Sequence, residues 1–234
     1  MTLLKKTVAA CSVALAGLAA APAGAAVVGS IPGAGEVNNF LSLNSISSAA
    51  GWFGANLYLT GPATIDITYF GGEAGFANRF EYGSCTINHI GGGMASNNNT
   101  IVANAAGTAC GSVADSGLLD FSFFVNNVLG PQNGANPGNA PSSPNFFVTL
   151  SNSLLISGID TSTGDGVLGS GTVAWLFLDD AGGVGDDDNH DDMVIRLNIS
   201  QGGGFQVPEP TSLALLGAAL FGLGAARRRA AAKQ

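Results

Sequence analysis

Short apolar segments that alternate with small or polar residues recur along the middle of the chain, and they constrain its fold more than any other feature. In residues 65–69, Ile, Asp, Ile, Thr and Tyr alternate in this way, and residues 194–199 repeat the pattern. A period of two residues is typical of a β-strand with one buried face, and glycine pairs such as Gly71 and Gly72 mark turns. We therefore predict an all-β domain, a β-sandwich of jelly-roll type. The predicted strands cover residues 55–60, 64–70, 78–82, 118–125, 145–150, 172–178 and 193–200.

Three stretches of the same region lack the alternation. Residues 126–144 contain four prolines among Asn, Gly and Ser, which predicts a mobile surface loop. Residues 91–99 are rich in Gly and Asn and are also predicted to be irregular. For residues 27–48 two alternatives stay open, because residues 40–43 fit an edge strand as well as a short helix.

The first 26 residues have the three parts of a secretory signal peptide. Lys5 and Lys6 form a basic region, residues 8–20 are apolar, and the small residues 23–25 provide a cleavage site. We therefore predict that the chain is exported and that this segment is removed.

The predicted exported domain, residues 27–206, is strongly acidic. It holds twelve Asp and three Glu but only two basic residues, Arg79 and Arg196, which gives a net charge of −13. Such a domain repels nucleic acid and anionic membrane surfaces and attracts cations. We therefore expect no nucleic-acid partner.

Two cysteines, Cys85 and Cys110, lie in this domain. An even pair in an oxidising compartment indicates a disulfide, and we predict one between them. The alternative, a cysteine nucleophile assisted by the nearby His89, lacks a recognisable protease signature.

The C-terminal segment, residues 207–234, contains an uncharged apolar run with a basic cluster behind it. Residues 213–226 carry no charge, and with Thr211 and Ser212 they predict a transmembrane helix over about 211–226. The helix is short, because about 20 apolar residues cross a bilayer comfortably. Basic residues stay on the cytoplasmic side, so the arginines at 227–229 place the preceding domain outside.

This segment resembles the PEP-CTERM sorting signal, which combines a Pro-Glu-Pro motif, a short apolar helix and a terminal Arg cluster. The resemblance implies recognition by an exosortase, a membrane enzyme resembling cysteine proteases, during export across the inner membrane of a Gram-negative bacterium. It also implies a transient membrane anchor followed by a cell-surface or extracellular location. An ordinary tail anchor would explain the helix and the arginines but not the prolines beside them. The residues that carry the resemblance are Val207, Pro208, Glu209, Pro210, Arg227, Arg228 and Arg229.

A dense cluster of aspartates separates the last two predicted strands. Seven of the twelve Asp of the domain lie between residues 179 and 192, among glycines. Carboxylates this close repel one another unless a cation or hydrogen bonds compensate. Ca²⁺ takes about six to eight oxygen ligands in flexible geometry and suits such a loop. We predict a calcium site whose candidate ligands are Asp179, Asp186, Asp188, Asp191 and Asp192.

Two alternatives stay open for this loop. A solvated acidic hairpin that only aids solubility would contain the same residues. A transition metal suits the loop less well, because His190 is the one nitrogen ligand within it. The loop also lacks the Gly and Glu positions of an EF-hand.

Two segments of the domain extend the resemblance to PEP-CTERM surface proteins. Residues 175–196 resemble an acidic motif of many such proteins, and residues 67–78 resemble a companion motif. Within the companion motif, Glu73 is either a structural partner of Arg79 or a binding residue, and we expect the structural pairing.

Two further groups of residues have a functional and a structural interpretation. Residues 160–166 form either a second cation loop or an ordinary turn, and we expect the turn. Trp52, Phe53, Trp175 and Phe177 either stack on sugars or fill the core, and we expect the core.

Enzymatic signatures are missing from the sequence. It contains no Gly-x-Ser-x-Gly elbow, no P-loop and no His-Glu-x-x-His, and two histidines are few for acid–base catalysis. We expect a non-enzymatic surface or extracellular-matrix protein, such as a biofilm component, with a calcium-stabilised loop. The alternatives are a carbohydrate-binding module that retains exopolysaccharide and, less favoured, a secreted hydrolase with paired aspartates.

Overall fold

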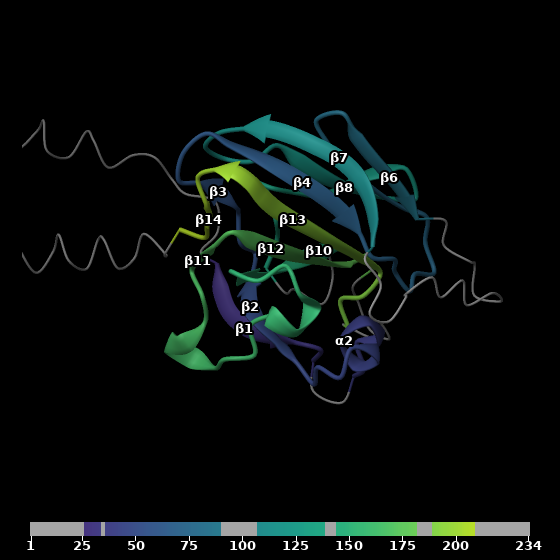
Figure 1. Cartoon of the computed structure of the whole chain (residues 1–234). Helices are drawn as coiled ribbons and strands as arrows, with labels where there is room; N and C mark the ends of the chain where they lie inside the picture. Colours follow the sequence, from purple (N-terminus) through teal and green to yellow (C-terminus); the bar gives the residue numbers. More distant parts are fainter. Residues whose placement is uncertain (1–25, 34–35, 90–106, 139–143, 182–188, 209–234) are drawn as a thin grey trace, which may run out of the picture.

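A computed structural model describes residues 26–33, 36–89, 107–138, 144–181 and 189–208, and antiparallel strands dominate it (Figure 1). Within these residues the strands form three sheets, of seven, four and three strands. The prediction of an all-β domain is therefore confirmed. The jelly-roll topology stays a prediction, because a jelly roll has eight strands in two sheets, whereas the described strands form three sheets.

The seven-stranded sheet spans the molecule and the two smaller sheets pack beside it. Its strands are, in spatial order, β1 (Val27–Ile31), β2 (Ala49–Phe53), β10 (Asn145–Ser151), β12 (Val173–Asp179), β13 (Met193–Gly202), β4 (Ala63–Tyr69) and β7 (Thr108–Asp115). The four-stranded sheet contains β6 (Cys85–His89), β5 (Asn78–Tyr82), β8 (Phe121–Val125) and β9 (Val128–Gln132). The three-stranded sheet contains β11 (Ser170–Gly171), β14 (Phe205–Gln206) and β3 (Tyr58–Leu59). Among the described ranges, the helical segments are α2 (Asn39–Leu43), η2 (Ile156–Gly158) and η3 (Gly164–Gly166).

One face of the large sheet packs against the four-stranded sheet and encloses the main core. Ile65 and Ile67 of β4 are buried in this core, whereas Asp66 between them is not. Phe80 of β5 and Phe123 of β8 meet them from the other sheet, with ring centroids 5.1 Å apart. The alternation that predicted these strands therefore marks the inner face of a sandwich.

The opposite face of the large sheet carries a second core. Every residue of β10 and β12 is buried, because these central strands are covered on both faces. Phe40 of α2 packs on this face against Trp175 and Phe177, with ring centroids 5.7 and 5.8 Å away. Because both faces of these strands are buried, their sequences are nearly continuous apolar runs.

Most of the predicted strands are present, with some corrections. Six of them are confirmed as β4, β5, β8, β10, β12 and β13, whereas residues 55–60 contain only the short β3. The loop predicted at 126–144 is wrong in part, because β9 lies within it and pairs with β8. Of the two alternatives for residues 40–43, the short helix is the one observed, because these residues belong to α2. The edge strand β1 lies earlier in the segment and was not predicted. Residues 91–99 lie outside the described residues.

The disulfide predicted between Cys85 and Cys110 is present, with Cα atoms 5.7 Å apart. It links β6, at the edge of the four-stranded sheet, to β7, at the edge of the large sheet. The bond therefore fastens the two layers of the sandwich together on one side.

The predicted export segments lie largely outside the description. Residues 1–25 of the signal peptide and residues 211–226 of the predicted transmembrane helix are not among the described residues. Within those that are, no helix has the length and apolar character needed to cross a membrane.

Candidate functional site

The hairpin between β12 and β13 gathers part of the acidic cluster at one end of the large sheet. Asp179 ends β12, and Asp191 and Asp192 directly precede β13. Since Leu178 pairs with Met193 across the hairpin, the aspartates that follow and precede them lie close together. The other two predicted ligands, Asp186 and Asp188, lie outside the described residues.

The described base of this hairpin is buried, whereas residues 182–188 of the loop lie outside the described residues. Asp179, Asp180 and Asp191 are 4%, 4% and 0% exposed. The Asp180 N–H donates to Asp192 Oδ2 at 2.7 Å, and the Ala181 N–H donates to Asp179 Oδ1 at 3.2 Å. These carboxylates are built into the fold, where hydrogen bonds replace part of their hydration.

The Asp192 carboxyl group has a pKa raised well above its ordinary value. Burial is the largest cause, followed by the charge of Asp180, while the hydrogen bond from the Asp180 N–H acts in the opposite direction. The charges of Asp179 and Asp191 add to the increase. The cluster therefore resists full ionisation, and a nearby cation would relieve that resistance.

The segment after β4 lies directly against this base. The Glu73 N–H donates to the Asp191 carbonyl at 2.9 Å, and the Val194 N–H donates to the Gly71 carbonyl at 2.9 Å. A Cβ atom at Gly72 would lie 2.0 Å from the Asp192 carbonyl oxygen, so only glycine fits there. The two motifs that the sequence places more than a hundred residues apart therefore form one structural unit.

The residues around α2 hold the base from the other side. Asn38 caps α2 by accepting the Leu41 N–H, and its Nδ2 donates to the carbonyls of Asn189 and His190 at 2.9 and 3.0 Å. The Asn39 N–H donates to Asp191 Oδ2. The hairpin base is thus tied to an element about 150 residues earlier in the sequence.

His190, the one nitrogen donor of the loop, is a fully buried residue with a left-handed backbone (φ 59°). Its Nε2 lies 2.9 Å from Asn145 Oδ1, and its ring packs against Phe53 at a centroid distance of 5.5 Å. These contacts place the imidazole ring against the second core, so it is not exposed as a surface ligand would be.

The described residues do not by themselves form a cation site. Asp179, Asp191 and Asp192 each accept an N–H with one oxygen, and no described group of three or more His, Cys, Asp or Glu has an arrangement that could hold a metal ion. Asn78 offers one more oxygen near the base. Its Nδ2 donates to Asp180 Oδ2 at 2.5 Å, and its buried Oδ1 has no hydrogen-bond partner within the described residues. Sequence reasoning missed Asn78, whose place beside Asp180 arises from strand packing alone.

Cys85 and His89 do not form a nucleophile and base. The sulfur of Cys85 is bonded to Cys110, and the Nδ1 of His89 lies 2.7 Å from the Tyr69 hydroxyl. His89 is buried, and burial lowers the pKa of its imidazole.

The remaining predicted features have structural roles. Arg79 forms an ion pair with Glu81, with 2.7 Å between Nε and Oε1, and this pairing replaces the expected partnership with Glu73. Asp160 accepts the N–H groups of Ser162 and Leu168, both at 2.9 Å, as in a capped turn. The four aromatic residues considered for sugar stacking, Trp52, Phe53, Trp175 and Phe177, are buried in the two cores.

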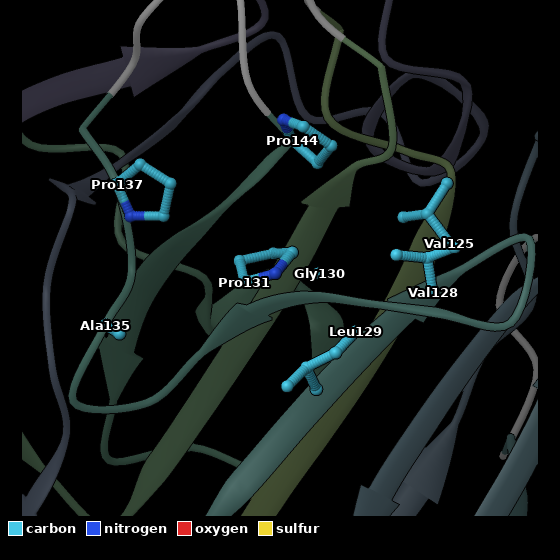
Figure 2. A pocket seen from close by; sticks show the side chains of 8 residues that line it. All are labelled: Val125, Val128, Leu129, Gly130, Pro131, Ala135, Pro137 and Pro144. Carbon is cyan, nitrogen blue, oxygen red and sulfur yellow. The ribbon is translucent and has the colours of Figure 1, made fainter.

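A cavity of about 440 Å³ lies beside β9 (Figure 2). The described residues that line it are aliphatic or glycine, and none of them is charged or aromatic: Val125, Val128, Leu129, Gly130, Pro131, Ala135, Pro137 and Pro144. Such a lining offers neither a stacking platform nor polar side chains for a sugar.

The chain leaves the folded domain at Val207. Its side chain is 2% exposed within the main core, and its N–H donates to the Gly169 carbonyl at 2.9 Å. Pro208, the next residue, is exposed, and Glu209, Pro210 and the arginines at 227–229 lie outside the described residues.

Comparison with protein families matches residues 206–229 to the PEP-CTERM protein-sorting motif. The chain carries a PEP-CTERM sorting motif. This motif implies export, processing at a membrane on the way to the cell surface, and an exosortase as partner. No curated protein and no solved structure matches the chain.

The PEP-CTERM motif begins inside the folded domain. Gln206, its first residue, pairs with Tyr58 and Ser170 in the three-stranded sheet, and Val207 closes the core. The domain and the motif therefore join without a linker.

Proposed function

We propose that the protein is a non-enzymatic surface or extracellular-matrix protein of a Gram-negative bacterium. Residues 211–226 anchor it transiently in the inner membrane, and an exosortase then cleaves the C-terminal segment. The PEP-CTERM motif at residues 206–229 carries this proposal. The disulfide between Cys85 and Cys110 supports it, because such bonds persist in oxidising compartments.

Cell fractionation tests the sorting step. The chain is produced in hosts with and without exosortase, as wild type and as the Glu209→Ala variant, with Glu36→Ala as a matched control outside the motif. We expect wild type and Glu36→Ala to reach the surface only with exosortase, and Glu209→Ala to stay in the membrane fraction. Equal distribution of all three proteins in both hosts would contradict the proposal.

We further propose that the acidic hairpin binds Ca²⁺ through Asp179, Asp191 and Asp192, together with Asp186 and Asp188. Two observations support this. The pKa of Asp192 is raised, so the cluster opposes its own ionisation, and Asn78 Oδ1 is a buried oxygen without a described partner beside Asp180. A bound calcium ion would supply positive charge to offset the repulsion between the carboxylates.

Thermal melting tests the calcium proposal. A ligand that binds only the folded state stabilises it by about 2.7 kcal/mol at a concentration 100 times its Kd. We therefore expect a clear rise of Tm in millimolar CaCl2 relative to EDTA, a smaller rise for Asp192→Asn, and an unchanged rise for the exposed control Asp120→Asn. Identical melting in CaCl2 and EDTA would sink the proposal.

The structure gives less support to the exopolysaccharide-binding alternative than to the calcium proposal. The candidate stacking residues are buried, and the cavity beside β9 is aliphatic. Glycan-array binding by the secreted protein would revive this alternative.

A further inference from the structure

The three-stranded sheet has an outer face where the chain leaves the domain. Tyr58, Gln206 and Ser170 are direct cross-strand partners, so their side chains lie on the same face. The adjacent residues of these strands, Leu59 and Phe205, are buried in the main core. Because side chains alternate between the two faces of a strand, Tyr58, Gln206 and Ser170 point outward.

Other exposed residues adjoin this outer row. Leu118 forms a β-bridge with Tyr58, and Leu168 precedes Gly169, whose carbonyl accepts the Val207 N–H. Tyr58, Leu118 and Leu168 are 38%, 40% and 39% exposed. We define the exit face as Tyr58, Leu118, Leu168, Ser170, Gln206 and Pro208.

The exit face is uncharged, in contrast to the domain as a whole. None of its six residues is acidic or basic, although residues 27–206 carry a net charge of −13. The carboxylate that borders it is that of Asp160, which accepts the Leu168 N–H at 2.9 Å. The acidic hairpin lies at the opposite ends of β12 and β13, which run from the exit side to Asp179 and Met193 (Figure 1). Seven residues of β12 at about 3.3 Å each separate the two ends by roughly 20 Å.

The start of the apolar run lies close to the exit face. Only Glu209 and Pro210 separate Pro208 from Thr211, where the predicted membrane helix begins. An extended chain covers at most about 3.6 Å per residue, so Pro208 lies within about 11 Å of that helix. The headgroup region on each side of a bilayer is roughly 5–8 Å thick, so the exit face must approach or enter it.

We propose that the exit face rests on the outer surface of the bilayer while the precursor is anchored. Tyrosine is favoured at the headgroup level, which suits Tyr58, and the leucines contact the adjoining lipid. The base of the acidic hairpin then lies roughly 20 Å from the membrane contact, so its repulsion from anionic lipid is weakened there. This inference rests on the proposed transient anchor.

Fluorescence quenching by brominated lipid tests the contact. The exported precursor is purified from a host without exosortase and reconstituted into phosphatidylethanolamine–phosphatidylglycerol vesicles that contain lipid brominated on its acyl chains. Tyr58→Trp places an indole on the exit face, and Leu118→Trp serves as a second probe. Val128→Trp places one on an exposed site of β9, near the acidic end, as the matched control. Trp52 and Trp175 contribute the same background to the three single variants. Because Trp52 Nε1 donates to the Leu168 carbonyl at 3.1 Å, the double variant is compared with Leu168→Asp alone.

We expect brominated lipid to reduce the added emission of Tyr58→Trp and Leu118→Trp but not that of Val128→Trp. Adding Leu168→Asp to Tyr58→Trp should weaken the quenching, because it puts a charge on the exit face. Equal quenching of all three probes would overturn the contact. An absence of quenching would also overturn it, and would leave the anchor intact, if the protein resists an alkaline carbonate wash of the vesicles. Protein that washes off the vesicles would overturn the anchor and the contact together.

Discussion

Asp192 carries a carboxyl group whose ionisation the fold opposes. Its raised pKa means that the folded state holds this proton more tightly than the unfolded state does. In the unfolded state the carboxyl group has its ordinary pKa of 3.8. The resulting stabilisation is present below that value and is lost as the pH rises through the folded-state pKa. In the absence of a cation, the ionised Asp192 therefore weakens the fold.

Asp192→Asn should raise the free energy of unfolding near neutral pH in EDTA. The amide oxygen still accepts the Asp180 N–H, but the side chain carries no charge. We expect a gain on the order of 1 kcal/mol, the repulsion between two unit charges about 4 Å apart in water. Urea denaturation across a pH series measures it, and the gain should shrink towards low pH.

Asp120→Asn is the control for this change, because Asp120 is exposed and lies outside the cluster. It should leave the unfolding free energy near that of wild type. A destabilised Asp192→Asn variant at neutral pH in EDTA would show that the carboxylate is favourable where it stands.

Gly72 allows two distant segments to touch. Alanine at this position would push its Cβ into the Asp192 carbonyl, whereas a Cβ at Gly75 meets nothing within 4 Å. We expect Gly72→Ala to cost about 2 kcal/mol of stability and Gly75→Ala almost none, because forced overlap in a packed region typically costs 1–3 kcal/mol. Chemical denaturation of both variants measures the difference, and equal stabilities would contradict this close approach.

At the scale of elements, the strands with clear alternation were predictable and the others were not. β4 alternates buried and partly buried residues, and this pattern is visible in its sequence. β7 is a largely exposed edge strand of small residues, so its sequence carries no apolar signal. β9 contains Gly130 and Pro131, which favoured a loop, yet β9 lies at a sheet edge, where proline is tolerated.

The disulfide is the covalent link between the edges of two sheets. Because Cys85 and Cys110 are 25 residues apart, replacing both by alanine should lower stability by about 3 kcal/mol in the chain-entropy model. Urea denaturation with and without reductant measures this cost. Reductant should destabilise the wild type by a similar amount and leave the double variant unchanged. If reductant shifted both proteins equally, its effect would not come from this bond.

Across the whole molecule, the candidate site was predictable in composition but not in its surroundings. The run of aspartates between two strands is local in sequence, so the cluster itself was evident. Asn38, Gly72 and Asn78 contact it from positions more than a hundred residues away, and no spacing in the sequence records those contacts. Burial of the hairpin base likewise depends on α2 and on the segment after β4.

The molecule as a whole has two unlike ends, an acidic end around Asp191 and an uncharged exit face that leads into the PEP-CTERM motif. This polarity fits a precursor held at a membrane by its C-terminal segment and later released. The motif itself was recognisable in the sequence, because its signal is a local order of residue types.

The intact mass of the protein recovered from the cell surface tests the proposed anchoring and C-terminal cleavage most directly. In a host with exosortase, the mass should correspond to a chain that has lost the arginines at 227–229 together with the apolar run before them. In a host without exosortase, the membrane fraction should retain both. A surface protein that still carries Arg227, Arg228 and Arg229 in the exosortase-positive host would contradict C-terminal processing.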